Sequence, residues 1–588
     1  MSAVDVWHNP SRHRLLEQAK YPRRPCASNE CDTNLVDTAQ PESRGTPSAV
    51  RLPPRRRPSK WTFMPDKLLR HVLSDMQFAC IFLSPPTETL PSRHSFRDIL
   101  LPLSISTAFG HQHPSPLSSS CPLLIVLARL YAIGSLFPLT GAASSVLSTI
   151  TTQAWNPLVN LCRNGTISQL QNLKLGKLVL FEGGSSEASA VFGNDKEGLP
   201  IAFLDVHDEK FWVRLALFAD MGFAESYMLG EFTSPDLTKF FELFILNRNY
   251  LSNGSNLTSA ISTGLAGLVR GSNNLKNARL NISAHYDISN EMFAAFLSPD
   301  MTYSSPIWLP KSNPKSELES LSDAQMRKLD RFIDNTHIKG SDHVLEIGTG
   351  WGSFAMRAVG RTGCRVTSLT LSIEQKVLAE ERIQEAGMSD KITVLLCDYR
   401  SLEIPETGAF DKIVSIEMLE AVGKEYLVTY FKCIDKLLKK EGGIACFQCI
   451  TMPDARYEAY AKSDDFIRRY IFPGGHLPAV SELVSSINTA SNGTLVVDSI
   501  ENIGPHYAKA LRLWREAFLE NWQDKIKPQL IKEKKDSGMD DEGAEIFKRK
   551  WDYYFRYSEA GFSTKTLGDV IITVGREGAV QMMEHVPL

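Results

Sequence analysis

Hydrophobic and polar positions alternate in regular blocks from about residue 276 to the end of the chain. Short apolar runs suited to buried strands are followed by segments in which apolar residues recur at helical spacing. The apolar runs are HVLEI, RVTSLTLS, KITVLLCDY, FDKIVSI and GGIACFQCI. This alternation is typical of an α/β doubly wound domain, and it predicts such a domain over residues 276–588.

Two different patterns precede this domain. Residues 155–275 contain the strand-like pieces KLVLFEGG and LPIAFLDVH, followed by Leu and Phe at helical spacing, and they predict a small folded domain. In residues 1–150, clusters of Pro, Ser and Arg such as RLPPRRRPSKW replace any lasting helix or strand period. We therefore expect residues 1–150 to be largely disordered. Their basic cluster could contact anionic lipid headgroups or could be a solvated tail.

An apolar run over residues 122–150 is long enough to cross a membrane. However, Arg129 lies inside the run and Pro138 interrupts it. Because charge near the middle of a membrane span is costly, we favour an interfacial or core helix over a span. No signal peptide is recognisable before this run, so we expect a cytoplasmic protein.

The charge and the cysteine content argue against two classes of protein, those that coat nucleic acid and those held together by disulfides. The 588 residues include 64 basic and 67 acidic side chains, for a net charge of −3, which argues against a protein built mainly to coat nucleic acid. The 10 cysteines do not resemble a secreted disulfide framework. Cys446 and Cys449 lie close together in an apolar run without a second pair, so we interpret them as ordinary strand cysteines.

A glycine-rich turn follows the first apolar run of the larger domain. Gly348, Gly350 and Gly352 come directly after the acidic residue Glu346, and a helical segment follows them. Glycines allow close approach of the backbone to a ligand. An acid at this strand end suits a ligand with an ammonium group better than a pyrophosphate, which favours S-adenosylmethionine over NAD. The alternative is a glycine-rich packing turn.

Polar side chains recur at the ends of the predicted strands. Thr370, Gln375, Asp398 and Glu420 each lie at or just beyond such an end. Ligands of open α/β sheets bind at the carboxyl ends of the strands. These residues therefore predict one ligand site together with the glycine turn.

From about residue 200 onward, the chain resembles the cyclopropane fatty acid synthases and the related mycolic acid and acyl-chain methyltransferases. Several segments around the candidate site look most like the eukaryotic, plant and fungal, members. The motifs that carry the resemblance are ESYMLGEF, AHYDISNEMFAAFLSPDMTYSSPIW, VLEIGTGWG, LTLSIEQ, IEMLEAVG, YIFPGGHLP and YYFRYSEAGF.

The resemblance implies a fold and a reaction. The fold is a class I S-adenosylmethionine-dependent methyltransferase domain, a Rossmann-like seven-stranded sheet with a helical lid, preceded by a small α+β domain that helps seat lipid. The reaction transfers a methyl group from S-adenosylmethionine to the cis double bond of a phospholipid acyl chain and closes a cyclopropane ring. A peripheral enzyme at the membrane surface is implied, and it could form a homodimer.

The resemblance also implies roles for single residues. Tyr303 and Ser304 match residues that hold the methionine end of the cofactor, and Thr370 and Gln375 match its ribose contacts. Tyr554 matches the tyrosine that faces the reacting centre. A bicarbonate ion is the implied general base, and residues matched to its binding site are Glu420, Ile450, Ser305 and Gln448.

Two of these positions depart from the family pattern. Ser305 stands where many members have cysteine, and Gln448 stands where bacterial members have histidine. If they redirect proton loss, a methylene- or methyl-branched acyl chain or sphingolipid base becomes the alternative product. A catalytically silent protein that binds lipid and S-adenosylmethionine is a second alternative, although Glu420 and Tyr554 are both present.

We expect no metal site. The path by which the acyl chain enters the enzyme is predicted only from the type of residue. His285 and His476 lack the spacing of metal ligands, so we interpret them as structural or cofactor-shell residues. Apolar residues around Phe293 to Leu297 could line the acyl-chain route or could form plain helix core.

Overall fold

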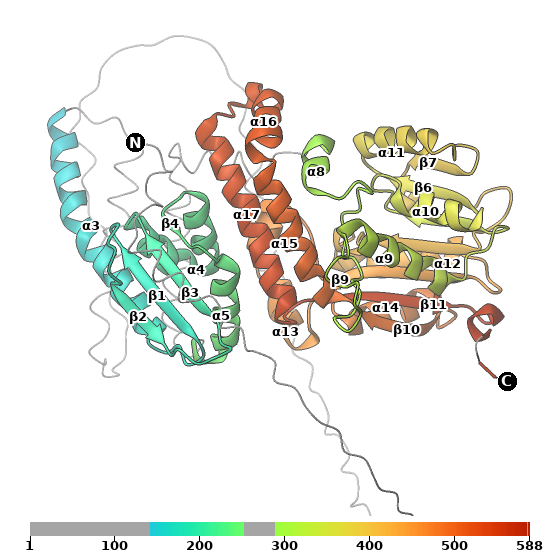
Figure 1. The fold of residues 1–588 in the computed structure, drawn as a ribbon, viewed down its shortest axis with the longest axis horizontal. Helices are drawn as coiled ribbons and strands as arrows, with labels where there is room; N and C mark the ends of the chain where they lie inside the picture. The colour runs from blue at the N-terminus through green and yellow to red at the C-terminus, as the bar shows by residue number, and fades with distance from the viewer. Residues whose placement is uncertain (1–140, 252–287, 585, 588) are drawn as a thin grey trace, which may run out of the picture. The chain divides into compact units, whose positions relative to one another are not determined.

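The computed structural model describes residues 141–251, 288–584 and 586–587, and it contains two β-sheets (Figure 1). The first sheet has four strands in the order β2-β1-β3-β4, with β1 and β3 parallel and the other neighbours antiparallel. Its region comprises α3 (Gly141–Leu170), β1 (Lys177–Glu182), β2 (Ala190–Gly193), β3 (Ile201–Val206), α4 (Lys210–Met228), β4 (Phe232–Thr233) and α5 (Leu237–Leu251).

Helix α3 differs from the expectation for the N-terminal stretch. It begins at Gly141, inside the range 1–150 that we expected to be largely disordered, and it continues through Pro157 to Leu170. The apolar run over 122–150, for which we favoured a helix, overlaps the first part of α3, and the helix continues past residue 150. The remainder of residues 1–150, the segment 252–287 and His285 lie outside the described residues.

The second sheet has seven strands in the order β10-β11-β9-β8-β5-β6-β7. Strands β9, β8, β5, β6 and β7 run parallel to one another, and β11 is antiparallel to β9 and β10. The five predicted apolar runs are confirmed as strands of this sheet. The strands are β5 (His343–Ile347), β6 (Arg365–Thr370), β7 (Ile392–Leu396), β8 (Lys412–Ile416), β9 (Ile444–Thr451), β10 (Val496–Asn502) and β11 (Gly568–Gly575).

Helices cover both faces of the seven-stranded sheet. Helices α9 (Leu321–Thr336), α10 (Ser353–Thr362) and α11 (Ile373–Glu385) share one apolar cluster with the sheet. Helices α12 (Leu427–Leu437) and α14 (Val480–Ser491) share the other. Cys446 belongs to the first cluster and Cys449 to the second, so the two thiols are buried on opposite faces and do not pair. The predicted doubly wound α/β architecture is therefore confirmed.

Further helices lie beyond the sheet. Helices α15 (Gly504–Glu520) and α17 (Asp541–Ser563) lie side by side and pack through buried aromatic rings (Figure 1). The other elements are α8 (Asn290–Phe296), η3 (Tyr399–Ser401), η4 (Leu419–Ala421), η5 (Lys424–Tyr426), α13 (Asp454–Lys462), η6 (Ile467–Ile471), η7 (Trp522–Ile526), α16 (Lys527–Glu533), η8 (Lys535–Ser537) and η9 (Val580–Met583).

Helix α17 is fastened to the ESYMLGEF segment by a buried polar contact. The Tyr227 hydroxyl donates to Oδ2 of Asp552 at 2.5 Å, and Arg515 Nε donates to Oδ1 of the same carboxylate at 2.6 Å. The guanidinium of Arg549 lies 4.3 Å from the centre of the Tyr227 ring. Since α17 also carries Tyr554, these contacts fix the helix that brings Tyr554 to the sheet.

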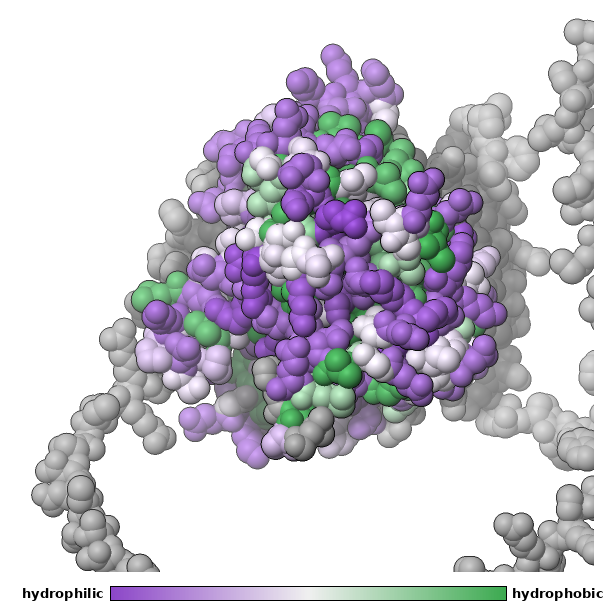
Figure 2. Space-filling view, turned by 90° about the vertical axis from the view of Figure 1, so that its right-hand side faces the viewer, coloured by the Kyte–Doolittle hydropathy of each residue, from purple (hydrophilic) through white to green (hydrophobic). Residues whose placement is uncertain are grey.

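The surface in Figure 2 is mixed in character. Hydrophobic residues form several small groups among hydrophilic ones, without merging into one continuous patch on this face. Scattered apolar residues are ordinary on the water-exposed side of a folded domain. Among the helices of the described ranges, none has the combined length and apolar character needed to cross a bilayer.

The Asp552 contact gives a stability prediction. Asp552→Asn leaves Arg515 and Arg556 without their buried carboxylate, so we expect the free energy of unfolding to fall by about 3 kcal/mol. Chemical denaturation followed by circular dichroism measures this change. The matched control is Glu380→Gln, which removes the acid of a surface pair with Lys376 and should change stability by less than about 0.5 kcal/mol. Equal effects of the two substitutions would contradict the structural role of Asp552.

Candidate active site at the strand ends

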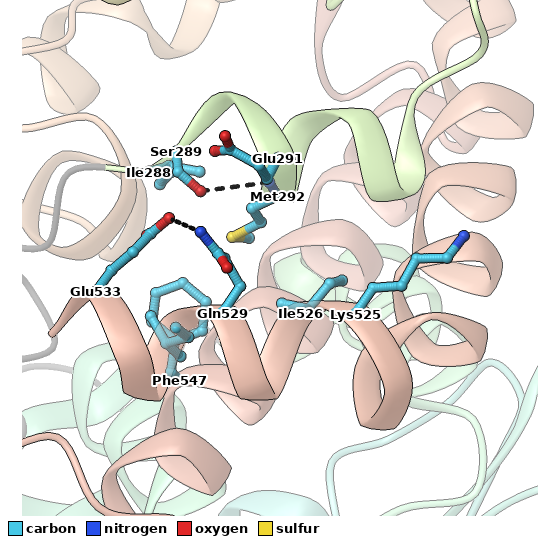
Figure 3. Close-up of a pocket in the computed structure, with 10 residues that line it drawn as sticks. Ile288, Ser289, Glu291, Met292, Lys525, Ile526, Gln529, Glu533 and Phe547 are labelled. Atoms are coloured by element: carbon cyan, nitrogen blue, oxygen red, sulfur yellow. Dashed lines mark hydrogen bonds between the residues drawn. The ribbon is translucent and has the colours of Figure 1, made fainter. Parts of the chain in front are cut away.

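The surface has a pocket between α8 and α16 (Figure 3). Its wall includes Met292 of α8, Phe547 of α17 and the hydrogen-bonded pair Gln529 and Glu533 of α16. None of the residues predicted to react lines this pocket. Those residues come together at the carboxyl ends of the parallel strands.

The glycine turn connects β5 to α10. Gly348, Gly350 and Gly352 have φ angles of 102°, 53° and 86°, which side chains rarely adopt. A Cβ atom added at Gly350 would meet no atom within 4 Å, so this turn borders open space as a ligand-binding turn requires. Glu346 is buried at the end of β5 and accepts a 2.5 Å hydrogen bond from Ser368. Burial raises the pKa of the Glu346 carboxyl to about 8.

The ends of β6 and β7 carry the next predicted residues. The Thr370 hydroxyl donates to Oε1 of Gln375 at 2.9 Å, so the two side chains are in contact. Ser372 caps helix α11 by accepting from the Gln375 N–H, which fixes the position of Gln375. Asp398 differs, because its carboxylate is engaged by the backbone and side chain of Arg400, and that contact holds the pKa of Asp398 below its usual value.

Two tyrosines meet across the site. The hydroxyl groups of Tyr303 and Tyr554 lie 2.8 Å apart, although the residues are 251 positions apart in the chain. The Tyr303 ring packs against Phe293 and Trp514, and Phe472 meets the Tyr554 ring edge-on. Burial raises the pKa of Tyr554, so this hydroxyl stays protonated. Electron-rich ring faces near a reacting centre can stabilise a cation.

Next to Tyr303, Ser304 contacts a buried lysine that the sequence did not identify. Lys328 Nζ of α9 donates to the Ser304 hydroxyl, and Gln325 of the same helix donates to the Ser304 carbonyl at 2.7 Å. Burial lowers the pKa of Lys328 to about 8, and the nearby carboxyl groups oppose that shift. Its position on the mainly apolar face of the helix, beside Leu329 and Phe332, was the available signal.

Glu417 is the second residue that the site assignment missed. Its carboxylate accepts hydrogen bonds from Ser305 N at 2.7 Å, Gln448 Nε2 at 2.7 Å and the Tyr507 hydroxyl at 2.8 Å. Gln448 Nε2 also donates to Oδ2 of Asp569 at 2.7 Å. Burial and the neighbouring carboxyl raise the pKa of Asp569 well above its usual value. The position of Glu417 directly after β8 was a sequence signal for such a role.

Glu420 lies one turn beyond Glu417. Its Oε1 accepts from the Ile450 N–H at 2.5 Å, so the predicted residues Glu420 and Ile450 are in contact. Oε2 of Glu420 is buried and has no hydrogen-bond partner among the described residues. Burial, and then the charge of Glu417, raises the pKa of Glu420 to about 8. The backbone N–H of His476 donates to the Glu420 carbonyl, while its ring contacts the Tyr457 hydroxyl.

The donors at this site do not fit a bicarbonate ion. The Ile450 N–H is taken by Glu420, and the Gln448 amide nitrogen bridges Glu417 and Asp569. The backbone N–H of Ser305 is taken by Glu417 as well. A further anion placed among these three donors would therefore meet the carboxyl groups of Glu417, Glu420 and Asp569.

Comparison with known proteins identifies the family. Residues 273–571, about half of the chain, match the model of the family described as mycolic acid cyclopropane synthetase. The chain belongs to the mycolic acid cyclopropane synthetase family. The matched region reaches from before α8 into β11 and includes all the site residues named above.

Three relatives illustrate the range of this cyclopropane synthetase family. The tuberculostearic acid methyltransferase of Mycobacterium tuberculosis is 38% identical over 61% of this chain and 79% of its own length. The cyclopropane-fatty-acyl-phospholipid synthase of Escherichia coli is 30% identical over 65% of this chain and 90% of its own length. A sphingolipid C9-methyltransferase of Gibberella zeae is 32% identical over 48% and 50%, respectively.

The buried acid at the end of β5 gives a pH prediction. The pKa of Glu346 is about 8 in the folded protein and 4.5 as its ordinary value. Between pH 4.5 and pH 8, the folded protein therefore keeps a proton on Glu346 that the unfolded chain has released. Stability should therefore fall as pH rises from about 5 to about 8, by on the order of 3 kcal/mol for this group. Thermal unfolding scans across this range measure the slope. Glu346→Gln should flatten it, and an unchanged slope in that variant would contradict the assignment.

Proposed function

We propose that this chain is an S-adenosylmethionine-dependent C-methyltransferase that acts as a cyclopropane-fatty-acyl-phospholipid synthase. The observation that carries the proposal is the contact between the Tyr303 and Tyr554 hydroxyl groups beside the partly buried acids Glu417 and Glu420. Such a site suits positively charged ligands and reacting centres. Family membership and the three relatives support the same chemistry.

The residues around the glycine turn fit S-adenosylmethionine. Gly350 borders open space, Glu346 offers a carboxyl group at the strand end, and Thr370 with Gln375 offers polar atoms beside it. When bound there, the cofactor supplies an activated methyl group on a positively charged sulfur. Glu346, Glu417, Glu420 and Asp569 outnumber Lys328, so the site has a local excess of groups that can carry negative charge.

The chain's own residues then act on the lipid. In this proposal the Tyr554 ring faces the reacting double bond, and its hydroxyl is held by the contact with the Tyr303 hydroxyl. Glu420 offers an unpartnered carboxyl oxygen that can take the proton lost after methyl transfer. The acyl chain must leave the bilayer to reach this site, so we expect the enzyme to work at a membrane surface.

A branched product is the second candidate. Two of the relatives are named as a tuberculostearic acid methyltransferase and a sphingolipid C9-methyltransferase. Both outcomes use the same methyl transfer and differ in which proton leaves, and a saturated branch also needs a reductant. A silent binding protein is disfavoured by the intact pair of Glu420 and Tyr554 in this site.

Lipid analysis tests the proposed reaction. In a bacterial host that lacks its own cyclopropane synthase, the chain should add one methylene to monounsaturated acyl chains, and the product should resist hydrogenation. Glu420→Gln and Tyr554→Phe should each reduce the product by on the order of 100-fold. Ser305→Cys should stay close to the parent, because the backbone N–H of Ser305 contacts Glu417.

Mass spectrometry of the fatty acids separates the outcomes. A product that hydrogenates would indicate a methylene branch, and one two hydrogens heavier would indicate a saturated methyl branch. Folded protein that binds S-adenosylmethionine without any new lipid would argue for another lipid substrate or for the silent binding protein.

The glycine turn gives a separate test of cofactor binding. Gly350→Ala places a methyl group in the open space of the turn, so we expect the dissociation constant of S-adenosylmethionine to rise on the order of tenfold or more. Isothermal titration calorimetry measures it. The control is Gly387→Ala after α11, where φ is also positive and a Cβ atom would also meet nothing within 4 Å. Equal affinities in the two variants would remove Gly350 from the cofactor site.

A further inference from the structure

Glu417 sits in an anion site built from three separate parts of the chain. Its donors are the Ser305 N–H in the segment before α9, Gln448 on β9 and Tyr507 on α15, all at 2.7–2.8 Å. Gln448 and Ser305 are fully buried, and Tyr507 is 4% exposed. Fixed donors at this spacing are the arrangement that holds a carboxylate in its charged form.

The backbone at Glu417 supports a specific role for the side chain. Its φ angle is 46°, in the left-handed region that costs a residue with a Cβ atom about 1 kcal/mol or more. A glycine would meet this backbone requirement without strain. Such strain persists where surrounding contacts hold it, and here those contacts are made by the carboxylate.

The neighbouring acids divide into different protonation states. Asp569 is fully buried, its Oδ2 accepts from Gln448 Nε2 at 2.7 Å, and its Oδ1 has no hydrogen-bond partner among the described residues. Burial raises the pKa of both acids, but Glu417 accepts three hydrogen bonds that oppose this shift and Asp569 accepts one, so Glu417 is the acid of the pair that ionises first. Lys328 supplies the facing positive charge, Glu420 lies beside the pair, and Tyr303 and Tyr554 close the site as neutral groups.

We propose that Glu417 is a built-in counter-anion whose carboxylate fills the site made by Ser305, Gln448 and Tyr507, so that the reaction needs no bicarbonate and Glu420 takes the proton. This inference rests on the proposed methyl transfer. Methyl transfer leaves a neutral thioether and moves the positive charge to the neighbouring acyl carbon. A C–H bond of that cation then breaks, its electrons form the ring or a double bond, and the proton passes to Oε2 of Glu420.

Glu417 is a positioning residue in this scheme. Its fixed charge lies near the place where positive charge develops, and it keeps Glu420 basic by repulsion between like charges. It also occupies the donors that an external anion would need. The first consequence concerns the parent protein. Its lipid methylation rate should change less than about twofold between carbonate-free buffer and buffer with added bicarbonate, whereas a loss of about tenfold restored by bicarbonate would overturn the proposal.

Substitution of Glu417 tests the anion site directly. Glu417→Gly fits the backbone and leaves a carboxylate-sized space, so we expect methylation to fall about tenfold or more and to recover with added formate or bicarbonate. Glu417→Gln fills the space without charge and should be impaired without recovery. Glu501→Gln, in the β10 pair with Arg331, is the control and should respond to neither ion. Full activity of Glu417→Gly, or a loss that neither ion relieves, would overturn the proposal.

Ion binding provides a readout that needs no turnover. Carbon-13 NMR titration should detect bicarbonate binding to Glu417→Gly and much weaker binding to the parent and to Glu417→Gln. Circular dichroism checks that each variant is folded. If the parent methylates no lipid, the proposed function fails while this titration still decides whether Glu417 fills an anion site. Equal bicarbonate binding by the parent and Glu417→Gly would overturn the inference.

Discussion

The burial of several carboxyl groups at one end of the seven-stranded sheet is the constraint on which the site depends. Glu346, Glu417 and Asp569 come from three strand ends, and Lys328 is the cation that faces them. Removing such groups from water is costly unless each is protonated or hydrogen-bonded. The hydrogen-bond donors are divided unequally, with three on Glu417 and one on Asp569, so the fold favours ionisation of Glu417 over ionisation of Asp569. A cationic ligand would relieve the remaining imbalance.

Helix α17 connects this electrostatic site to the smaller sheet. Tyr554 reaches Tyr303, while the preceding Tyr553 packs against Phe241 and Phe466, and Asp552 binds Tyr227. Neighbouring positions on a helix point to different sides, so one helix serves both purposes. The ESYMLGEF segment therefore contributes to the site at a distance, by fixing the helix from which Tyr554 projects. A role in seating lipid would add to this mechanical role.

The sequence predicted the parts of the fold that depend on local pattern. Apolar runs located five strands, and the glycines after Glu346 located the turn, because strand burial and positive φ angles leave direct marks in the sequence. The contacts of Glu417 depend instead on how β8, β9 and β11 align. In the sheet Ile416 pairs with Gln448, and Ile450 pairs with Asp569, which brings together residues 121 positions apart. The order of residues along one strand does not show how that strand aligns with its neighbours in the sheet. Helix α3 was expected only in part, because the apolar run indicated a helix over residues 122–150 and the structure has the helix at Gly141–Leu170.

The two departures from the family pattern, Ser305 and Gln448, are both explained by the hydrogen bonds to Glu417. Ser305 contributes its backbone N–H, a group that cysteine would also supply, so its side chain matters less than the sequence suggested. Gln448 contributes an amide nitrogen with two hydrogens, and it uses them on two different carboxyl groups. A neutral histidine offers a single N–H, so it could donate to only one of the two carboxyl groups. Glutamine at this position and a carboxylate at 417 therefore belong together, because the amide nitrogen is one of the donors that the buried carboxylate needs.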